Sequence, residues 1–169
     1  MAKIYLTGYM YSGKTTLGKQ LARRLSYDFF DTDQLFEEKF KISIPAFFER
    51  YGEVHFRTME QQILHTTENL KNVVISTGGG TACFNRNMEW MHEQGITIYL
   101  KMSPERLFSR YKVSKKKRPL LDNLSPEQTL NYIRNHLAGR EQFYSKAQII
   151  FETEHLNIDT LEKVIRFII

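Results

Sequence analysis

One stretch near the N-terminus limits what this chain can fold into more than any other. Residues 8–15 read Gly-Tyr-Met-Tyr-Ser-Gly-Lys-Thr and match the pattern G-x-x-x-x-G-K-[ST] at every fixed position. An apolar run at residues 4–6 precedes the stretch, and leucines at positions 17, 21 and 25 follow it at helical spacing. A strand, a glycine-bounded loop and a helix in this order predict a phosphate-binding loop. The alternative is a glycine-rich turn before a surface helix, and the flanking strand and helix disfavour it.

The chemistry of the loop suits a nucleoside triphosphate and a magnesium ion. Gly8 and Gly13 allow the backbone to turn its N–H groups inward toward an anion, and the helix that starts near Lys14 adds a positive dipole end. The Lys14 ammonium can reach the outer phosphates, and the Thr15 hydroxyl is a hard oxygen ligand of the kind that Mg²⁺ prefers.

The rest of the sequence predicts one α/β domain spanning residues 1–169. Strand candidates at 3–7, 28–31, 73–76, 96–100 and 149–151 alternate with helical segments, including a short helix over 43–52 and a longer one over 53–70. This alternation predicts a parallel sheet with helices on both faces, a three-layer α/β/α architecture. Cys83 is the only cysteine, and no apolar run approaches the ~20 residues of a membrane span. We therefore expect a cytoplasmic protein without a membrane partner.

A pair of carboxylates closes the second predicted strand. Asp31 and Asp33 are two residues apart, so in an extended chain they share one face. That places them at the carboxyl edge of the sheet, where open α/β folds bind ligands, with one carboxylate toward a metal and the other toward a hydroxyl. The alternative role is the N-cap of the following helix.

Three glycines and two arginines point to a second ligand beside the nucleotide. Gly78, Gly79 and Gly80 follow the third strand and predict a substrate floor, with a flexible turn as the alternative. Arg57 lies beside the apolar stripe of its helix, and Arg140 occupies a stripe position. Arginines at such positions are seldom buried without a partner, so the two predict a clamp for a ligand carboxylate. The alternative is an internal ion pair, for which Glu60 and Glu141 are the candidate partners.

The basic run from Arg110 to Arg118 admits three interpretations. A mobile lid, placed at about 112–121, would bring a cation over the transferring phosphate. A nucleic-acid patch lacks interleaved aromatic residues beyond Tyr111, and a solvated loop is the plainest alternative. The net charge of +5 fits either a nucleic-acid binder or a site for anionic small molecules. The five histidines show no metal-ligand spacing and are expected in ordinary surface or core positions. Taken together, the residues predict phosphoryl transfer from a nucleoside triphosphate to a small hydroxy acid.

At this level of detail the chain resembles the shikimate kinases over roughly residues 4–147. The resemblance is carried, in order, by G-x-x-x-x-G-K-T at 8–15, Asp31-x-Asp33, Gly52-Glu53-x-x-Phe56-Arg57-x-x-Glu60, Gly78-Gly79-Gly80, Arg118-Pro119-Leu120-Leu121 and Arg140-x-x-x-Tyr144. The first motif is common to phosphate-loop proteins, whereas the others together are specific. The resemblance implies a nucleoside-monophosphate-kinase-like fold with a five-stranded parallel sheet and a lid. It also implies the reaction of ATP with shikimate to give ADP and 3-phosphoshikimate, a step of chorismate and aromatic amino-acid synthesis.

The resemblance also implies roles for matching positions. Shikimate would be bound by Asp33, Arg57, Gly78, Gly79, Gly80 and Arg140. The nucleotide would be bound by Tyr11, Ser12, Gly13, Lys14, Thr15, Thr16, Arg110 and Arg118, with Arg110 beside the adenine and Arg118 on the lid. Thr15 and Asp31, the latter through water, would hold Mg²⁺, and Lys14, Asp33 and Arg118 would be catalytic.

Three departures from the family pattern stand out. Gln142 replaces a usual proline, Tyr9 and Tyr11 replace smaller or aliphatic loop residues, and the lid is rich in lysine. Two rival functions follow from the residues: a kinase of another small hydroxy acid such as gluconate, or a phosphate-loop protein that binds nucleotide or nucleic acid without transferring phosphate. We expect shikimate as the partner, no nucleic acid, and a monomer.

Overall fold

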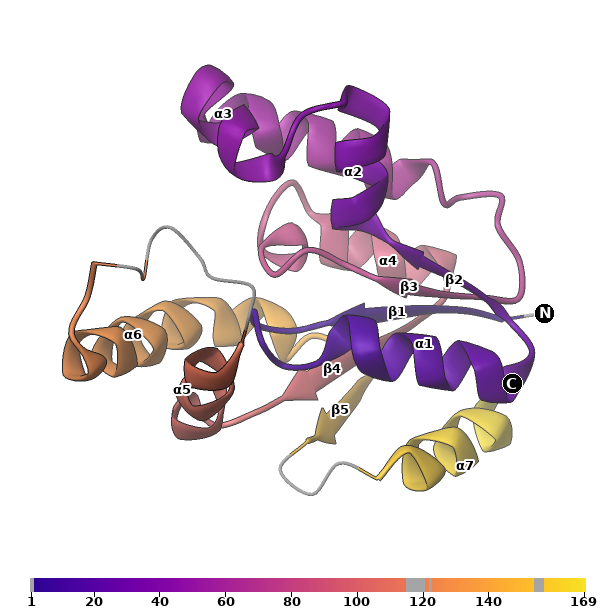
Figure 1. Cartoon of the computed structure of the whole chain (residues 1–169). Helices are drawn as coiled ribbons and strands as arrows, with labels where there is room; N and C mark the ends of the chain where they lie inside the picture. The colour runs from indigo at the N-terminus through magenta and orange to yellow at the C-terminus, as the bar shows by residue number, and fades with distance from the viewer. Residues whose placement is uncertain (1, 115–120, 122, 154–156) are drawn as a thin grey trace.

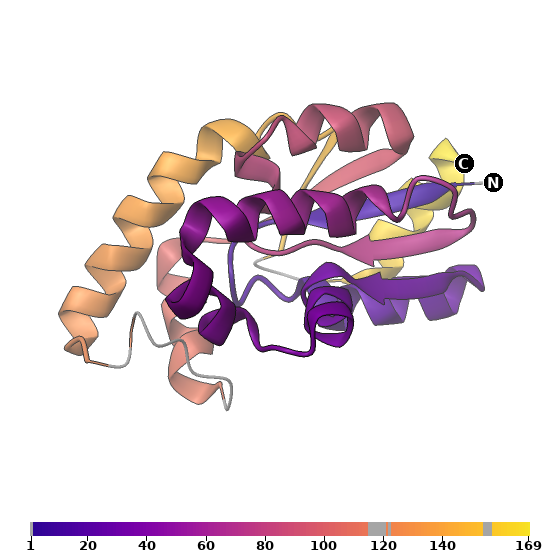
Figure 2. The same ribbon diagram turned by 90° about the horizontal axis from the view of Figure 1, so that it is seen from above.

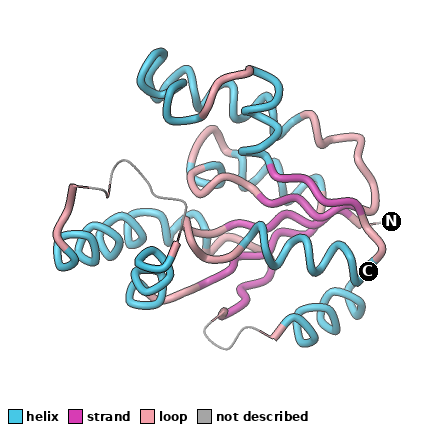
Figure 3. The backbone as a smooth tube through the Cα atoms, in the orientation of Figure 1, coloured by secondary structure: helices cyan, strands magenta, loops and turns pink. Residues whose placement is uncertain are grey.

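The computed structural model describes residues 2–114, 121, 123–153 and 157–169 and contains one parallel sheet. Its five strands lie in the order β2-β3-β1-β4-β5 (Figures 1 and 3). Their bounds are β1 Lys3–Thr7, β2 Asp28–Asp31, β3 Val73–Ser76, β4 Ile96–Lys101 and β5 Ile149–Glu152. The predicted strands and their alternation with helices are confirmed, and the apolar runs of β1 and β3 are buried along their whole length, as central parallel strands require.

Helices follow each strand. They are α1 Lys14–Leu25, α2 Thr32–Phe40, α3 Ile44–His65, the 3₁₀ turn η1 Thr81–Cys83, α4 Asn87–Gln94, α5 Pro104–Val113, α6 Pro126–Tyr144 and α7 Ile158–Ile168. Sequence signals account for several ends: Ser125 and Gln128 form a capping box at the start of α6, and Gly95 ends α4. In the part of the chain that the structure describes, no helix is long and apolar enough to cross a bilayer.

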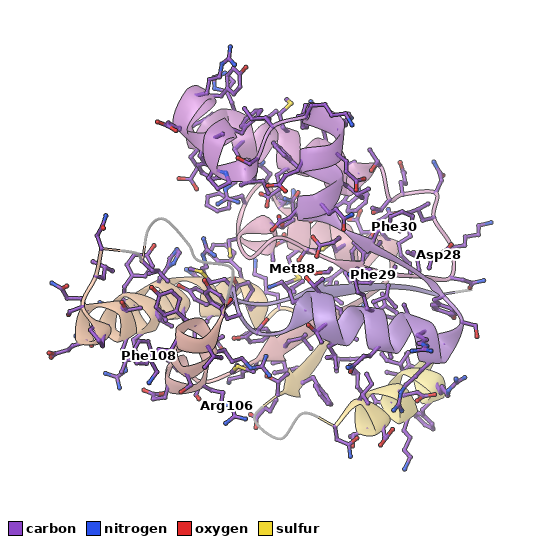
Figure 4. All side chains as sticks on the ribbon, viewed as in Figure 1. Asp28, Phe29, Phe30, Met88, Arg106 and Phe108 are labelled. Carbon is purple, nitrogen blue, oxygen red and sulfur yellow. The ribbon has the colours of Figure 1, made fainter. Side chains whose placement is uncertain are left out.

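The helices cover both faces of the sheet, which confirms the three-layer prediction (Figure 2). On one face, Leu17 and Leu21 of α1 and Leu161 of α7 pack on alternate strand residues. On the other face, helices α3, α4 and α6 pack through residues such as Met88 and Ile133. The labelled neighbours on β2 divide in the same way, since Phe29 packs in the first cluster and Phe30 in the second (Figure 4).

Helix α2 and the first half of α3 form a small unit that projects from the sheet edge (Figure 1). A cluster of aromatic rings holds it together: Phe36, Phe47 and Phe56 are each less than 10% exposed. The unit flanks the site on one side, while α5 and α6 lie on the other (Figure 1).

The predicted helix over 53–70 is corrected at its C-terminal end. Helix α3 ends at His65, where the Thr66 and Thr67 hydroxyls donate back to the carbonyls of Ile63 and Leu64. Such side-chain bonds compete with continued helix. Thr67 is nevertheless fully buried, and its Oγ1 lies 3.0 Å from the Tyr5 hydroxyl. The regular spacing of residues up to position 70 therefore indicates which side chains contact the core, and not how far the helix extends.

Candidate active site

The loop between β1 and α1 has the backbone geometry that the glycine pattern predicts. Gly13 has φ 94° and is the N-cap of α1, so the free N–H groups of that helix open toward the loop. Tyr11 lies in the left-handed region with φ 66°, an uncommon conformation for a tyrosine. Its ring packs edge-on against Tyr111 of α5, with 5.7 Å between ring centroids, which links the loop to the helix that precedes the lid segment.

Lys14 folds back over the loop. Its Nζ donates hydrogen bonds to the carbonyl oxygens of Gly8, at 2.8 Å, and Tyr9, at 2.9 Å. The side chain is 8% exposed. The ammonium therefore lies where the loop amides and the start of α1 converge, which is the position from which it can meet the outer phosphates of a nucleotide.

Thr15 and Asp31, the two residues predicted to hold the metal, are in direct contact. Thr15 Oγ1 donates to Asp31 Oδ2 at 2.7 Å, and Asp31 Oδ1 accepts from the backbone N–H groups of Asp33 and Gln34. Asp31 thus serves both as the helix N-cap and as a neighbour of the phosphate loop, so the two interpretations were not exclusive. Among the described residues no cluster of three or more His, Cys, Asp or Glu side chains could hold a metal by itself. Two hard oxygens beside a phosphate site fit Mg²⁺, which usually keeps several waters and binds substrate phosphates.

The geometric reason given for pairing Asp31 with Asp33 is wrong, although both residues reach the site. Strand β2 ends at Asp31, and Asp33 belongs to the first turn of α2. Alternation along a strand therefore does not relate the two carboxylates. Asp33 instead lies against the glycine triplet, where a Cβ atom at Gly78 would be 2.7 Å from Asp33 Oδ1.

The glycine triplet is packed closely against its neighbours. A Cβ atom at Gly80 would lie 2.6 Å from Nη1 of Arg57, and one at Gly79 would lie 3.4 Å from the Met10 amide nitrogen. The triplet meets the phosphate loop because β1 and β3 are adjacent, with the Thr77 N–H and hydroxyl both bonded to the Leu6 carbonyl. This close packing disfavours a flexible turn, and the substrate floor stays a prediction.

Arg57 has the internal partner that the alternative interpretation named, Glu60, together with a second partner that was not predicted, Glu53. Its Nη1 donates to Glu60 Oε2 at 2.8 Å, and Nη2 donates to Glu53 Oε1 at 3.1 Å. The guanidinium also lies 4.1 Å from the centroid of the Phe84 ring. These contacts fix the orientation of the side chain, which is 11% exposed and lines the pocket above the triplet.

Arg140 reaches the same pocket from α6. Its Nη1 donates to the Gly79 carbonyl at 3.0 Å, and the Tyr144 hydroxyl donates to the same oxygen. Glu141, the expected alternative partner, instead accepts from the Tyr99 hydroxyl at 2.7 Å and lies 3.5 Å from Lys101 Nζ. The stripe position therefore directs Arg140 to the glycine floor and not into an ion pair with its neighbour.

Arg110 approaches the phosphate loop from α5. Its Nη1 donates to the Tyr11 carbonyl at 3.2 Å and would lie 2.8 Å from a Cβ atom at Gly13. Burial lowers the pKa of this guanidinium, and the charge of Arg106 lowers it further. Most of the predicted lid lies outside the described residues, and this part includes Arg118, Pro119 and Leu120.

Two pockets meet across the glycine floor. The first has a volume of about 610 Å³ and is lined by Lys14, Thr15, Thr16, Asp31 and Arg110 among others. The second, of about 350 Å³, is lined by Arg57, Arg140 and the triplet together with Phe48 and Phe56. Met10, Asp33 and Gly79 line both pockets. The predicted triphosphate site and the pocket that holds both arginines therefore share one carboxylate, that of Asp33, which suits group transfer between two bound molecules.

Sequence reasoning missed His136, which was expected in an ordinary surface or core position. The imidazole lines the second pocket, and its Nδ1 lies 2.9 Å from the Tyr9 hydroxyl. Burial lowers its pKa to about 4, with the charges of Arg140 and Arg57 contributing next. The signal was present in the sequence: His136 precedes Arg140 by four residues, so the two share a helix face. Glu60, considered only as an ion-pair partner, also lines the pocket.

Comparisons with known proteins agree with this geometry. The sequence model of the shikimate kinase family matches residues 10–169. A shikimate kinase from Phocaeicola vulgatus is 43% identical, with 96% of this chain and 98% of that protein covered. The crystal structure of shikimate kinase from Bacteroides thetaiotaomicron superposes with a TM-score of 0.92 at 38% identity, covering 99% of this chain and 97% of that one. Shikimate kinase from Acinetobacter baumannii in complex with shikimate gives 0.86 at 37% identity, covering 99% and 93%.

Proposed function

This chain belongs to the shikimate kinase family, and on that premise we propose that it transfers the γ-phosphoryl group of ATP to the 3-hydroxyl of shikimate. One observation carries the proposal: the phosphate-loop pocket and the two-arginine pocket share Asp33 and Gly79. A donor and an acceptor bound in these pockets face each other across Asp33. The product would be 3-phosphoshikimate, an intermediate on the route to chorismate and the aromatic amino acids.

The acceptor is held by the second pocket. Arg57 and Arg140 approach from different helices and offer charge-assisted hydrogen bonds to the carboxylate of shikimate. Phe48 and Phe56 give the pocket an apolar wall against the carbon ring. This arrangement positions the 3-hydroxyl toward Asp33, which orients it and accepts its proton as the oxygen attacks the γ-phosphorus. The bond between that phosphorus and the oxygen bridging to the β-phosphorus breaks, and ADP leaves with the electron pair.

The donor is held by the first pocket. Lys14 exchanges its carbonyl partners on Gly8 and Tyr9 for phosphate oxygens, and the amides at the start of α1 complete the cradle. Arg110 is close enough to the loop to neutralise charge or to contact the nucleotide base. Phosphoryl transfer needs positioning and charge neutralisation more than covalent chemistry from the protein. Thr15 and Asp31 would hold Mg²⁺, which would supply positive charge against the phosphate oxygens of the nucleotide.

A coupled assay of ADP release tests the proposal. Purified protein is supplied with ATP and Mg²⁺, and the rate with shikimate is compared with the rates with gluconate and without acceptor. We expect ADP release that depends on shikimate and is abolished in Lys14→Ala. Release driven by gluconate would favour the rival small-molecule kinase. Nucleotide binding without release, together with salt-dependent binding of duplex DNA, would favour the non-catalytic rival.

Several finer expectations stay predictions within this proposal. They are the cytoplasmic location, the monomeric state, the absence of a nucleic-acid partner, the single domain over 1–169 and the lid over about 112–121. The catalytic role of Arg118 is also a prediction, since this residue lies outside the described part of the chain.

A further inference from the structure

A tyrosine of the phosphate loop contacts a residue of the second pocket, the one lined by Arg57, Arg140 and the glycine triplet, which is called the acceptor pocket below. The Tyr9 side chain is 1% exposed, and its hydroxyl lies 2.9 Å from Nδ1 of His136 on α6. The two rings meet edge to face, with centroids 5.5 Å apart and planes at 84°. The tyrosine ring also faces the Arg140 guanidinium, whose Cζ is 5.9 Å from the ring centroid. A buried aromatic side chain with these contacts fixes the orientation of the imidazole.

One ring nitrogen of His136, Nε2, is the atom that can bind a ligand. The Tyr9 hydroxyl engages Nδ1, and no described residue makes a hydrogen bond to Nε2. The ring lines the acceptor pocket beside Arg57 and Arg140. The pKa of His136 is lowered to about 4 by burial and then by these two guanidiniums, so the ring is neutral at pH 7. A neutral imidazole presents one donor or one acceptor at Nε2, according to its tautomer.

We propose that His136 is a further acceptor-binding residue whose Nε2 pairs with a hydroxyl of the acceptor ring other than the one that is phosphorylated. The two guanidiniums already supply the positive charge that a carboxylate needs, whereas a hydroxyl both donates and accepts and so matches either tautomer of the imidazole. Tyr9 is the positioning residue for this contact. The inference rests on the proposed function, because it takes the acceptor to be a polyhydroxylated cyclic acid such as shikimate.

A competing role for His136 is purely structural: the imidazole would serve only to anchor Tyr9. Two substitutions separate the roles, because the amide of asparagine lies near the position of Nδ1 and that of glutamine near Nε2. His136→Asn retains a partner for Tyr9 and loses the group that faces the acceptor. His136→Gln retains the group that faces the acceptor. Tyr9→Phe leaves both imidazole nitrogens and removes the hydroxyl that fixes the ring.

The test is calorimetric titration of each folded variant with shikimate, without nucleotide. We expect His136→Asn to weaken shikimate binding by roughly 3- to 10-fold, the size of one neutral hydrogen bond, and His136→Gln to stay within about 2-fold of wild type. Tyr9→Phe is expected to fall between them. The control is His55→Asn, which changes an exposed histidine on α3 and should bind as wild type does. Unchanged binding by His136→Asn would overturn the inference.

Titration with 4-deoxyshikimate and 5-deoxyshikimate identifies the contacted hydroxyl. The penalty of His136→Asn should disappear for the analogue that lacks this hydroxyl and persist for the other. An equal penalty with both analogues contradicts the hydroxyl contact. The two proposals also fail differently: wild type that neither binds nor phosphorylates shikimate removes the proposed function and this inference with it, whereas active wild type with an unaffected His136→Asn removes the inference alone.

Discussion

At the scale of single residues, Arg57 has two roles, and its substitution should affect both ligand binding and stability. It faces the acceptor pocket, and it is the cationic partner of Glu60, which is 4% exposed. The other oxygen of Glu60 accepts from the Thr81 hydroxyl at 2.7 Å, so this carboxylate is held but its charge is balanced mainly by Arg57. Removing one partner of a buried ion pair leaves an uncompensated charge and is strongly destabilising.

We therefore predict two effects of Arg57→Ala. The KM for shikimate should rise roughly 10- to 100-fold through loss of a charged hydrogen bond, while the KM for ATP changes little. The free energy of unfolding should fall by about 3 kcal/mol. Steady-state kinetics and urea denaturation measure the two quantities, and Arg50→Ala, an exposed arginine on the same helix, is the control. Equal changes in both KM values would remove Arg57 from acceptor binding.

Asp33 is the residue that both pockets share, and its substitution should act on the rate. Asparagine keeps the shape of the side chain but accepts a proton poorly, so Asp33→Asn should lower kcat by roughly 100-fold or more with a small change in the KM for shikimate. Asp28→Asn is a matched control, because Asp28 is exposed at the opposite end of β2 (Figure 4). An unchanged kcat in Asp33→Asn would exclude Asp33 from proton transfer.

Residues of the site were predictable where a local motif defines the geometry. The phosphate loop depends on a few consecutive residues and on the start of α1, whereas the pairing of Thr15 with Asp31, 16 residues later, was implied by the family resemblance. Asp33 was assigned to the site for the wrong geometric reason, because strand β2 gives way to α2 one residue before it. The four-residue spacing from Arg140 places His136 on the same helix face, but its contact with Tyr9, 127 residues away, follows from no periodicity within a helix.

At the scale of elements, helix α3 is broken at one glycine. Gly52 has φ 78° and ψ 171°, a region that is essentially limited to glycine, and a Cβ atom there would have nothing within 4 Å. Any cost of substitution thus comes from the backbone and not from a clash. The break separates the segment that carries Phe47 and Phe48 from the segment that carries Phe56 and Arg57, so it sets how the two sides of the acceptor pocket meet.

We predict that Gly52→Ala lowers the free energy of unfolding by about 1–3 kcal/mol and raises the KM for shikimate. Gly139 in α6 is the matched control: a Cβ atom there also meets nothing within 4 Å, and its backbone is helical. Gly139→Ala should therefore stabilise the protein by about 0.5–1 kcal/mol. Thermal unfolding of both variants measures the changes in stability, and steady-state kinetics measure the KM for shikimate. Equal stabilisation by the two alanines would show that the break in α3 imposes no backbone requirement.

Element types were predicted better than their ends. Buried apolar runs located the strands because central parallel strands are covered on both faces. The end of α3 was misplaced because Thr67 and Leu70 continue the apolar spacing as turn residues packed on the core. Periodicity reports which side chains are buried, while the end of a helix depends on the hydrogen bonds of its last carbonyls.

At the scale of the whole molecule, strand order creates the site. Strand β1 lies between β3 and β4, so the loops after β1 and β3 meet at one edge, and the chain leaves β4 toward α5 on the other side. Ligands of open α/β sheets bind at such a point. The sequence indicated a parallel sheet but carried no local signal for the order of strands, and the family resemblance supplied that expectation.

The acid stability of the whole molecule should depend on the acceptor pocket. The pKa of His136 is about 4 in the folded protein and near 6.5 in an unfolded chain. Above pH 6.5 neither state binds the proton. Between about 6.5 and 4 the unfolded chain binds it and the folded protein does not, so stability falls as the pH falls.

We predict that wild type loses about 1–2 kcal/mol more of its unfolding free energy than His136→Gln between pH 7.5 and 4.5, since solvent screens part of the shift for a partly exposed ring. Urea denaturation across this range measures the difference, because carboxylates titrate alike in both proteins. His55→Gln removes an exposed histidine and should keep the pH slope of wild type. If the unfolding free energy of His136→Gln depends on pH as steeply as that of wild type, the pocket does not hold this imidazole neutral. Saturating shikimate should make the dependence steeper in wild type if the ligand engages Nε2.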